Sequence, residues 1–306
     1  MMTLPRPIQG IIPPVLTPLL DQDTLDAAAF ERLLDHLIAG GSTALFVLGS
    51  TGEAPGLSYR LRREVLSRAR DVVHGRVPLL VGITDTAYAE SLAAAEFAAE
   101  CGASALVLSP PYYYALSQAA FLGYLERLAP QLPLPLYLYN IPIFTKLLIS
   151  PETVKAAAAI PNIIGLKDSS GDREYFRACR DAVKHRPDFA LFGGVEEVLA
   201  DLVAEGAHGG VCGGANLYPR LYVDLYHAAA RGDRVTVERL QKIVLTISGG
   251  IYTVGDRTSS YLRGLKTAVS ILGIGNGYMA EPYRAFSPAE RDQLAAVLEQ
   301  VQALLD

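Results

Sequence analysis

The sequence predicts an α/β fold, a (β/α)8 TIM barrel with a C-terminal helical extension. Three observations predict it. Short apolar runs alternate with longer amphipathic segments, which is typical of repeated βα units and a parallel sheet. Eight such pairs fill about 230 residues, enough for a closed barrel. The rest of the chain has apolar residues at helical spacing and no strand pattern. We therefore expect a catalytic barrel over residues 1–232 and a helical region over residues 233–306.

The expected strands are short apolar runs bounded by turn residues. They cover residues 10–16, 44–48, 78–83, 105–108, 134–139, 163–167, 189–193 and 209–212. The helices expected after them cover residues 25–39, 58–73, 87–101, 117–132, 151–159, 173–184, 195–205 and 219–231. In the C-terminal region, residues 240–244, 261–272 and 288–305 show helical spacing. These segments are apolar enough to pack on the barrel or on a partner subunit.

Several helices carry start and stop signals in the sequence. Ser150 precedes Pro151, a good N-cap followed by proline at the first helical position. Gly40-Gly41, Gly102 and Gly206 fall where helix C-termini favour a left-handed residue. A doubly wound open sheet is the competing architecture, but no G-x-G-x-x-G follows the first strand.

Composition restricts the class of partner. The chain has 306 residues, a net charge of −5 and no run of lysines or arginines, so nucleic acid and membrane surfaces are not expected as partners. Its three cysteines are widely spaced and fit neither a zinc site nor a redox motif. No apolar stretch has the length of a signal peptide or membrane span. We expect a cytoplasmic protein that binds small molecules.

Lys167 is the first candidate for chemistry. It follows the apolar run Ile163-Ile164-Gly165-Leu166, which predicts a buried strand. Burial of a lysine disfavours the ammonium form and makes the amine a nucleophile that can condense with a ketone. The alternative is a structural lysine whose stem lies on apolar surface while its head reaches water.

Polar residues follow the other strands where a barrel places its chemistry, at the carboxyl ends. Ser50 and Thr51, between glycines, offer hydroxyls and backbone N–H groups suited to a carboxylate or an oxyanion. An ordinary turn is the alternative interpretation of this run. Tyr139 ends the strand before Lys167, so its phenol is expected to reach the amine or the oxygen it attacks and to shuttle a proton.

Five motifs, in this order, resemble the dihydrodipicolinate synthase / N-acetylneuraminate lyase family. They are Gly49-Ser-Thr-Gly-Glu53, Ser109-Pro-Pro-Tyr-Tyr113, Leu138-Tyr-Asn-Ile-Pro142, Ile164-Gly-Leu-Lys-Asp-Ser-Ser-Gly171 and Leu262-Arg-Gly-Leu-Lys-Thr267. The resemblance spans nearly the whole chain. It implies a (β/α)8 barrel with C-terminal helices, a homotetramer built from two tight dimers, and no metal or organic cofactor.

The resemblance also implies roles for single residues. Lys167 would form an imine with pyruvate or another 2-keto acid, and Tyr139 would move the proton. Ser50 and Thr51 would hold the pyruvate carboxylate and relay protons. Tyr113 would reach into the site of a neighbouring subunit. A protonated imine is an electron sink, so a C–C bond beta to it can form or break.

Other positions bear on the substrate. Where synthases of this family carry an arginine that grips the aldehyde's carboxylate, the aligned residue is Phe144, which has no donors. Glu196 and Glu197 resemble the acidic pair with which lyases bind substrate hydroxyls. The alternative is that both only complement the dipole of the next helix. Three further substrate contacts are expected at strand ends: Ser169, Gly194 and Cys212.

These expectations favour a Schiff-base aldolase that reversibly cleaves a 2-keto-3-deoxy sugar acid, or a related 4-hydroxy-2-oxo acid, to pyruvate and an aldehyde. A second hypothesis is a dihydrodipicolinate synthase in which Arg263 or Lys146 replaces the missing cation. A third is a non-catalytic barrel that binds a keto acid. A metal-dependent hydrolase is disfavoured, because no two of the five histidines have metal-ligand spacing.

Overall fold

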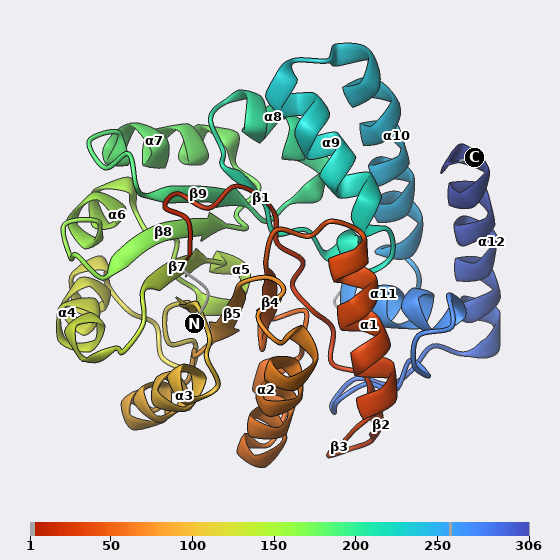
Figure 1. The fold of residues 1–306 in the computed structure, drawn as a ribbon, viewed down its shortest axis with the longest axis horizontal. Coiled ribbons are helices and arrows are strands. Elements are labelled where there is room, and N and C mark those ends of the chain that lie inside the picture. The colour runs from red at the N-terminus through yellow and green to blue at the C-terminus, as the bar shows by residue number, and fades with distance from the viewer. Residues whose placement is uncertain (1–3, 257–258, 306) are drawn as a thin grey trace.

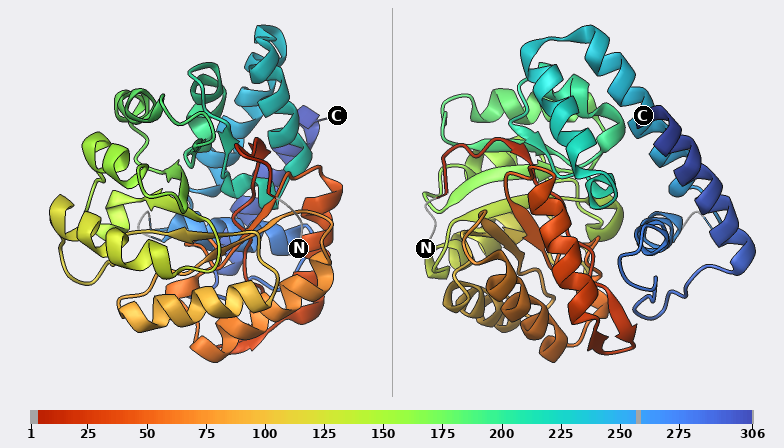
Figure 2. Two further views of the ribbon diagram at one scale, coloured as in Figure 1. Left: turned by 60° about the vertical axis from the view of Figure 1, so that its left-hand side comes forward. Right: turned by 45° about the vertical axis from the view of Figure 1, so that its right-hand side comes forward.

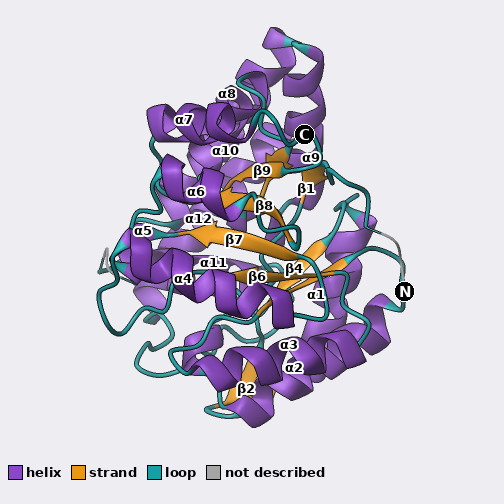
Figure 3. Ribbon diagram, turned by 90° about the vertical axis from the view of Figure 1, so that its left-hand side faces the viewer, coloured by secondary structure: helices purple, strands orange, loops and turns teal. Residues whose placement is uncertain are grey.

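The protein is described by a computed structural model that covers residues 4–256 and 259–305. Met1–Thr3 lie outside the described residues. A parallel eight-stranded sheet curls at the centre, and helices surround it (Figure 1, Figure 3). The order of neighbouring strands is β1-β10-β9-β8-β7-β6-β5-β4, as consecutive βα units require.

All eight expected strands are present, and all but β6 have shifted ends. They are β1 (Gly10–Ile11), β4 (Leu45–Val47), β5 (Leu79–Gly82), β6 (Ala105–Leu108), β7 (Leu136–Asn140), β8 (Ile163–Asp168), β9 (Ala190–Gly193) and β10 (Gly209–Gly210). Their residues are almost all buried, because helices cover the outside and side chains fill the inside. The predicted (β/α)8 barrel with C-terminal helices is confirmed.

The first strand is much shorter than residues 10–16. Pro13 and Pro14 lack the N–H group that a ladder needs, so the strand ends at Ile11. The chain nevertheless runs on beside β4, with a parallel bridge between Pro14 and Phe46. The Phe46 N–H donates to Pro13 O at 3.0 Å, and the Val15 N–H donates to Phe46 O at 2.8 Å. These contacts bring the two edges of the sheet together.

The last strand is also shorter than the expected 209–212. β10 approaches β1 so closely that a Cβ on Gly209 would lie 1.8 Å from Gly10 O, so glycine is required there. After Gly210, the Val211 N–H still donates to Gly193 O at 2.8 Å. The chain then turns into a 3-10 helix, η4 (Gly213–Asn216), instead of extending the strand through Cys212.

The barrel helices follow the strands closely (Figure 1). They are α1 (Ala27–Ala39), α2 (Tyr59–Val73), α3 (Tyr88–Glu100), α4 (Gln118–Leu128), α6 (Pro151–Ala157), α7 (Arg173–Val183), α8 (Leu199–Ala204) and α9 (Pro219–Arg231). The expected helix 117–132 ends early and continues as the 3-10 helix η2 (Ala129–Gln131), because Pro130 cannot continue the hydrogen bonds of an α-helix. The expected helix 195–205 begins as the 3-10 helix η3 (Glu196–Val198) before α8.

The predicted caps can be checked directly. The Ser150 hydroxyl accepts the Thr153 N–H at 3.2 Å, which confirms it as an N-cap. Gly41, Gly102 and Gly206 have φ of +90°, +73° and +101°, the left-handed values expected after a helix. Gly40 is the exception, because it is still in the right-handed helical region.

Two short elements were not predicted from the sequence. Strands β2 (Leu19–Asp21) and β3 (Thr24–Leu25) form an antiparallel hairpin beside α1, and α5 (Pro142–Thr145) is a single helical turn after β7. Both are too short to produce a periodic apolar pattern. The turn α5 matters for the site, because it carries Phe144.

The C-terminal region forms three helices: α10 (Arg234–Ile251), α11 (Ser260–Ile271) and α12 (Pro288–Leu305). Helix α10 is far longer than the expected 240–244. It runs against α9 and α12, while α11 lies across the barrel beside η4 (Figure 2). No described helix combines the length and apolar character that crossing a lipid bilayer requires.

Candidate active site

Lys167 and Tyr139 face each other across the paired strands β8 and β7, where their Cα atoms are register partners. Lys167 is 7% exposed. Its Nζ lies 3.9 Å from the centre of the Tyr139 ring and 5.4 Å from the centre of the Phe46 ring. Among the described residues it has no carboxylate or hydrogen-bonding partner, so this amine is held against aromatic faces alone.

Buried polar groups hold the ends of these two strands. The Asn140 side-chain amide donates to Asp168 Oδ1 at 2.8 Å, and Asn140 Oδ1 accepts the Ile149 N–H at 3.0 Å. Burial raises the pKa of Asp168, although hydrogen bonds from Asn140 and Ser170 oppose the shift. Since these residues directly follow Tyr139 and Lys167, the network fixes the direction in which both side chains leave the strands.

Gly194 keeps space open beside the amine. A Cβ at this position would lie 2.0 Å from Ser169 Oγ and 3.1 Å from Lys167 Cε. Both Ser169 and Gly194 are partly exposed. The structure therefore brings these two predicted residues next to Lys167, and an alanine at position 194 would crowd it.

A cavity of about 500 Å³ opens at the carboxyl end of the barrel. Its lining includes Phe46, Ser50, Tyr139 and Phe144. Lys167 is not part of the lining, but its Nζ lies against the Phe46 and Tyr139 rings, which are. The predicted Ser50, Tyr139 and Phe144 thus face one common space.

Thr51 follows Ser50 but is not part of the cavity lining. It is 4% exposed, and its hydroxyl lies 3.1 Å from the phenol oxygen of Tyr261 on α11. Burial raises the pKa of Tyr261, so the phenol keeps its proton and can donate it to the threonine. The loop that contains Ser50 and Thr51 is thereby tied to the C-terminal region.

Glu53 forms a second connection between this loop and the C-terminal region. It has left-handed backbone geometry at φ +55°, and its buried carboxylate forms an ion pair with the buried ammonium of Lys266. The other carboxylate oxygen accepts the Ala280 N–H at 2.9 Å. Burial lowers the pKa of Lys266, and Glu53 opposes that shift. Lys266 therefore has the partner that Lys167 lacks.

Glu196 is not available to substrate in the way its sequence suggested. It is 3% exposed, and Oε1 accepts the phenols of Tyr222 at 2.6 Å and Tyr252 at 2.8 Å. Oε2 accepts the Gly214 N–H at 3.0 Å. Burial raises the pKa of this carboxyl group. Both oxygens are engaged within the protein, which gives Glu196 a structural role that neither sequence interpretation included.

Glu197 and Cys212, two further residues expected to bind substrate, differ in their exposure to solvent. Glu197 is partly exposed and its carboxylate makes no hydrogen bond within the described residues, so it stays a candidate for substrate binding. Cys212 is fully buried in the apolar core between barrel and helices, and burial raises the pKa of its thiol well above the usual value. Its expected contact with substrate is therefore corrected, because no surface of Cys212 is accessible.

Tyr113 lies outside the cavity formed by its own chain. It is 69% exposed and meets Tyr114 edge-to-face, with ring centres 5.0 Å apart. The two tyrosines border a separate hollow beside Tyr88 and Tyr124. An exposed aromatic pair of this kind is suited to a protein interface.

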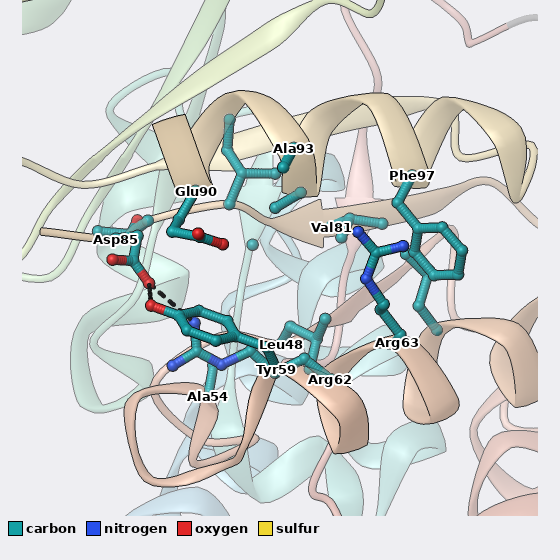
Figure 4. A pocket seen from close by; sticks show the side chains of 15 residues that line it. Leu48, Ala54, Tyr59, Arg62, Arg63, Val81, Asp85, Glu90, Ala93 and Phe97 are labelled. Atoms are coloured by element: carbon teal, nitrogen blue, oxygen red, sulfur yellow. Dashed lines mark hydrogen bonds and ion pairs between the residues drawn. The ribbon is translucent and has the colours of Figure 1, made fainter. Parts of the chain in front are cut away.

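A second, much smaller cavity of about 60 Å³ lies between α2 and α3 (Figure 4). The Tyr59 phenol and the Arg62 guanidinium both donate to Asp85 Oδ2, each at 3.1 Å. The space can hold a few water molecules at most, and its Arg62 and Asp85 already pair with each other. The cavity of about 500 Å³ is the candidate active site, because the Phe46 and Tyr139 rings that contact the Lys167 amine line it.

Sequence reasoning missed Tyr261, Tyr252 and the role of Lys266. All three come from the C-terminal region, which has no strand ends to mark chemistry. One signal was present: Lys266 sits within an otherwise apolar helical pattern, as Lys167 does in a strand. Within residues 4–256 and 259–305, no group of three His, Cys, Asp or Glu side chains is arranged to hold a metal ion.

Comparison with known proteins agrees with this fold. A solved dihydrodipicolinate synthase from Bacteroides thetaiotaomicron has a TM-score of 0.94 and 50% identity, covering 97% of this chain and 99% of its own. The Escherichia coli prophage protein YagE, solved with pyruvate, has a TM-score of 0.91 and 29% identity over 96% of this chain and 98% of its own. A probable 2-dehydro-3-deoxy-D-pentonate aldolase from Escherichia coli is 33% identical over 79% of this chain and 81% of its own.

The family model itself covers the barrel and nearly all of the C-terminal helices. It matches residues 7–301, so the residues around Lys167, Tyr139 and the Thr51–Tyr261 contact all fall within it. The chain belongs to the dihydrodipicolinate synthetase family.

Proposed function

We propose that the protein is a pyruvate-dependent class I aldolase that reversibly cleaves a 2-keto-3-deoxy sugar acid, or a related 4-hydroxy-2-oxo acid, into pyruvate and an aldehyde. The observation that carries this proposal is Lys167, a buried amine without a counterion beside the Tyr139 phenol. A structural lysine would need a charged partner, as Lys266 has in Glu53. No cofactor is needed for this chemistry.

In cleavage, the Lys167 amine adds to the C2 keto carbon, and water leaves to give a protonated imine. The C4 hydroxyl then loses its proton, and the C3–C4 bond breaks with its electron pair moving toward the imine. The aldehyde departs and leaves an enamine. Protonation at C3 and hydrolysis by water release pyruvate and restore the amine.

The surrounding residues have matching tasks in this scheme. Tyr139 carries the proton to and from the reacting oxygen, because its ring lies against the amine. Ser50 faces the cavity and, with Thr51 behind it, offers the hydroxyl and backbone donors that a carboxylate needs. Ser169 and Gly194 border the amine, so we assign them to the pyruvate end of the substrate.

The choice of a 4-hydroxy-2-oxo acid is supported by one relative and one residue. The Escherichia coli relative described above is named a probable 2-dehydro-3-deoxy-D-pentonate aldolase. Phe144 lines the cavity at the position where the family resemblance places the carboxylate-binding arginine of the synthases. A carboxylated aldehyde would find no guanidinium there.

A synthase that condenses pyruvate with aspartate semialdehyde is the second candidate, favoured by the name of the 50% identical Bacteroides protein. It requires a replacement cation. The Lys146 ammonium donates to the Tyr113 carbonyl at 3.2 Å, and the Arg263 side chain donates to the Arg284 carbonyl at 2.8 Å. Neither lines the cavity, which favours the aldolase.

Borohydride reduction in the presence of pyruvate, followed by peptide mass mapping, tests the proposal. We expect an adduct on Lys167 and none on Lys266, which serves as an internal control for reactivity of a buried lysine. The variant Lys167→Arg should give no adduct. An adduct on another lysine, or none at all, rejects the mechanism. An adduct without turnover of any aldehyde would favour the non-catalytic keto-acid barrel.

We further propose a cytoplasmic homotetramer assembled from two dimers, in which Tyr113 reaches the partner's site. The exposed Tyr113–Tyr114 pair supports this arrangement. The cytoplasmic location is supported by three buried cysteines that form no disulfide.

A further inference from the structure

Apolar side chains, which are usually buried away from water, line the entrance of the candidate active-site cavity. On one side, α5 presents Ile143, 80% exposed, and Phe144, 55% exposed. On the other side, Tyr283 follows Pro282, and Leu262 reaches the cavity from α11. These side chains come from both the barrel and the C-terminal region. Exposed apolar groups that converge on a cavity mark a surface that a ligand covers.

The charged side chains that line this cavity are all negative. Among the described residues that line the cavity there is no lysine, arginine or histidine, and the two carboxylates are Glu53 and Glu281. Glu53 is already neutralised by Lys266 and by the Ala280 N–H. Glu281 is exposed and free to repel a negative ligand. A carboxylate or phosphate on the aldehyde would lose its water here and gain no cation in exchange.

Three neutral hydroxyls of the lining, on Thr84, Ser109 and Thr145, are occupied within the protein. Thr84 Oγ1 accepts the Ser109 N–H at 2.9 Å and lies 3.3 Å from the Ser109 hydroxyl. The Thr145 hydroxyl donates to Ile141 O at 3.0 Å. Glu196, which the sequence offered for substrate hydroxyls, is bonded within the protein. In the proposed mechanism Ser50 and Tyr139 serve the pyruvate carboxylate and the proton transfer. The phenols of Tyr112 and Tyr283 are then the lining hydroxyls left to replace the water of a polyhydroxylated chain.

We infer that the aldehyde half of the substrate carries an apolar side chain, preferably an aromatic ring, that packs against Phe144, Ile143 and Leu262. This inference rests on the proposed aldolase function and selects within it a 4-hydroxy-2-oxo acid with an apolar group on C4. An aromatic ring would meet the Phe144 and Tyr283 rings from inside the cavity, with burial of its apolar surface as the driving force.

A panel of aldehydes with pyruvate tests the inference. We use phenylacetaldehyde and pentanal as apolar acceptors, D-glyceraldehyde as a hydroxylated one and succinate semialdehyde as a carboxylated one. The kcat/KM of each is measured from pyruvate consumption. We expect the apolar acceptors to exceed both others by about tenfold or more, the size of effect that filling an apolar pocket gives. An equal or higher value for glyceraldehyde or succinate semialdehyde overturns the inference.

Substitution at the entrance gives an independent readout. Phe144→Arg should lower the ratio of kcat/KM for phenylacetaldehyde to that for succinate semialdehyde by at least about tenfold, because it adds a cation and removes a ring. Phe144→Leu should keep the ratio above one. Leu148→Arg adds the same charge at an exposed apolar position outside the lining and should leave the ratio unchanged. A ratio that responds equally to both arginine variants contradicts the inference.

Failure of this inference is distinct from failure of the proposed function. If borohydride traps pyruvate on Lys167 but hydroxylated acceptors are preferred, the aldolase stands and the apolar substrate is rejected. If no adduct forms, both are rejected together.

Discussion

The hydroxyl oxygen of Thr51 lies 3.1 Å from the phenol oxygen of Tyr261, across 210 residues of sequence. Two residues further along, Glu53 is paired with Lys266 on the same helix, α11. The loop after β4 is therefore held from the C-terminal side as well as by the barrel. The C-terminal helices, expected as an extension, contribute to the wall of the candidate site.

Removing the Tyr261 phenol should slow catalysis without disturbing the fold. In Tyr261→Phe the ring still packs edge-to-face on Tyr252, at 4.8 Å between centres, but Thr51 loses its partner. The loss of one hydrogen bond of about 1.4 kcal/mol corresponds to about a tenfold fall in kcat. The rate of deuterium exchange into the pyruvate methyl group measures it. Tyr226→Phe, on the outer helix α9, is the matched control, and equal rates in both variants would argue against a role for Tyr261.

The Glu53–Lys266 pair should be costly to break from one side. Lys266→Met leaves a buried carboxylate without its cation, so the free energy of unfolding should fall by about 3–5 kcal/mol. Urea unfolding followed by circular dichroism measures this change. The double variant Glu53→Gln with Lys266→Met removes both charges and should recover part of the loss. A double variant less stable than Lys266→Met would show that the pair is not the origin of the effect.

Stability should fall as the solution becomes mildly acidic, and His208 should account for part of the fall. Its Nδ1 accepts the Leu191 N–H at 3.0 Å, which requires that nitrogen to be unprotonated. Burial lowers the pKa of His208 below its ordinary value of 6.5. The unfolded chain therefore takes up a proton first, so the stabilisation is present above pH 6.5 and is lost as the pH falls toward the folded-state pKa.

The variant His208→Asn isolates this contribution. The asparagine oxygen can still accept the Leu191 N–H, but it does not titrate. Urea midpoints at pH 7.5 and pH 5 should differ less in the variant than in the unmodified protein. Parallel pH dependence of the two proteins would exclude His208 as the source.

Activity should depend on association if Tyr113 completes a partner's site. Tyr113→Ala should lower kcat and weaken self-association in sedimentation velocity, because a 69% exposed ring loses its contact. Mixing Tyr113→Ala with Lys167→Arg should restore part of the activity. In such a mixed dimer, one site has an intact lysine and receives an intact tyrosine from its partner. No recovery, or an active monomer, would remove Tyr113 from the mechanism.

The barrel was predictable because local patterns specify it. Eight apolar runs separated by helical periodicity leave few other arrangements, and strand ends then indicate where polar residues converge. Ser50, Tyr139 and Lys167 were selected as candidates in this way. Strands β1 and β10 were overestimated, because two prolines and a close glycine approach end them earlier than apolar content suggests.

The partners of buried polar groups could not be predicted in the same way. Glu196 follows a strand as a substrate-binding residue would, yet Tyr222 and Tyr252 from later helices occupy its carboxylate. Tyr261 reaches Thr51 from a region with no local sign of chemistry. Such contacts depend on how helices distant in sequence pack, which no local period encodes.

Lys167 and Lys266 differ in what the sequence and what the tertiary structure determine about them. The sequence alone determined that Lys167 lies near the carboxyl end of a buried strand in a βα barrel and that Lys266 interrupts an apolar helix. Tertiary structure alone decided that Lys266 meets a carboxylate and that Lys167 meets aromatic rings. The physical reason is that burial follows from the local apolar pattern, whereas the presence of a counterion depends on which distant segment packs against the amine.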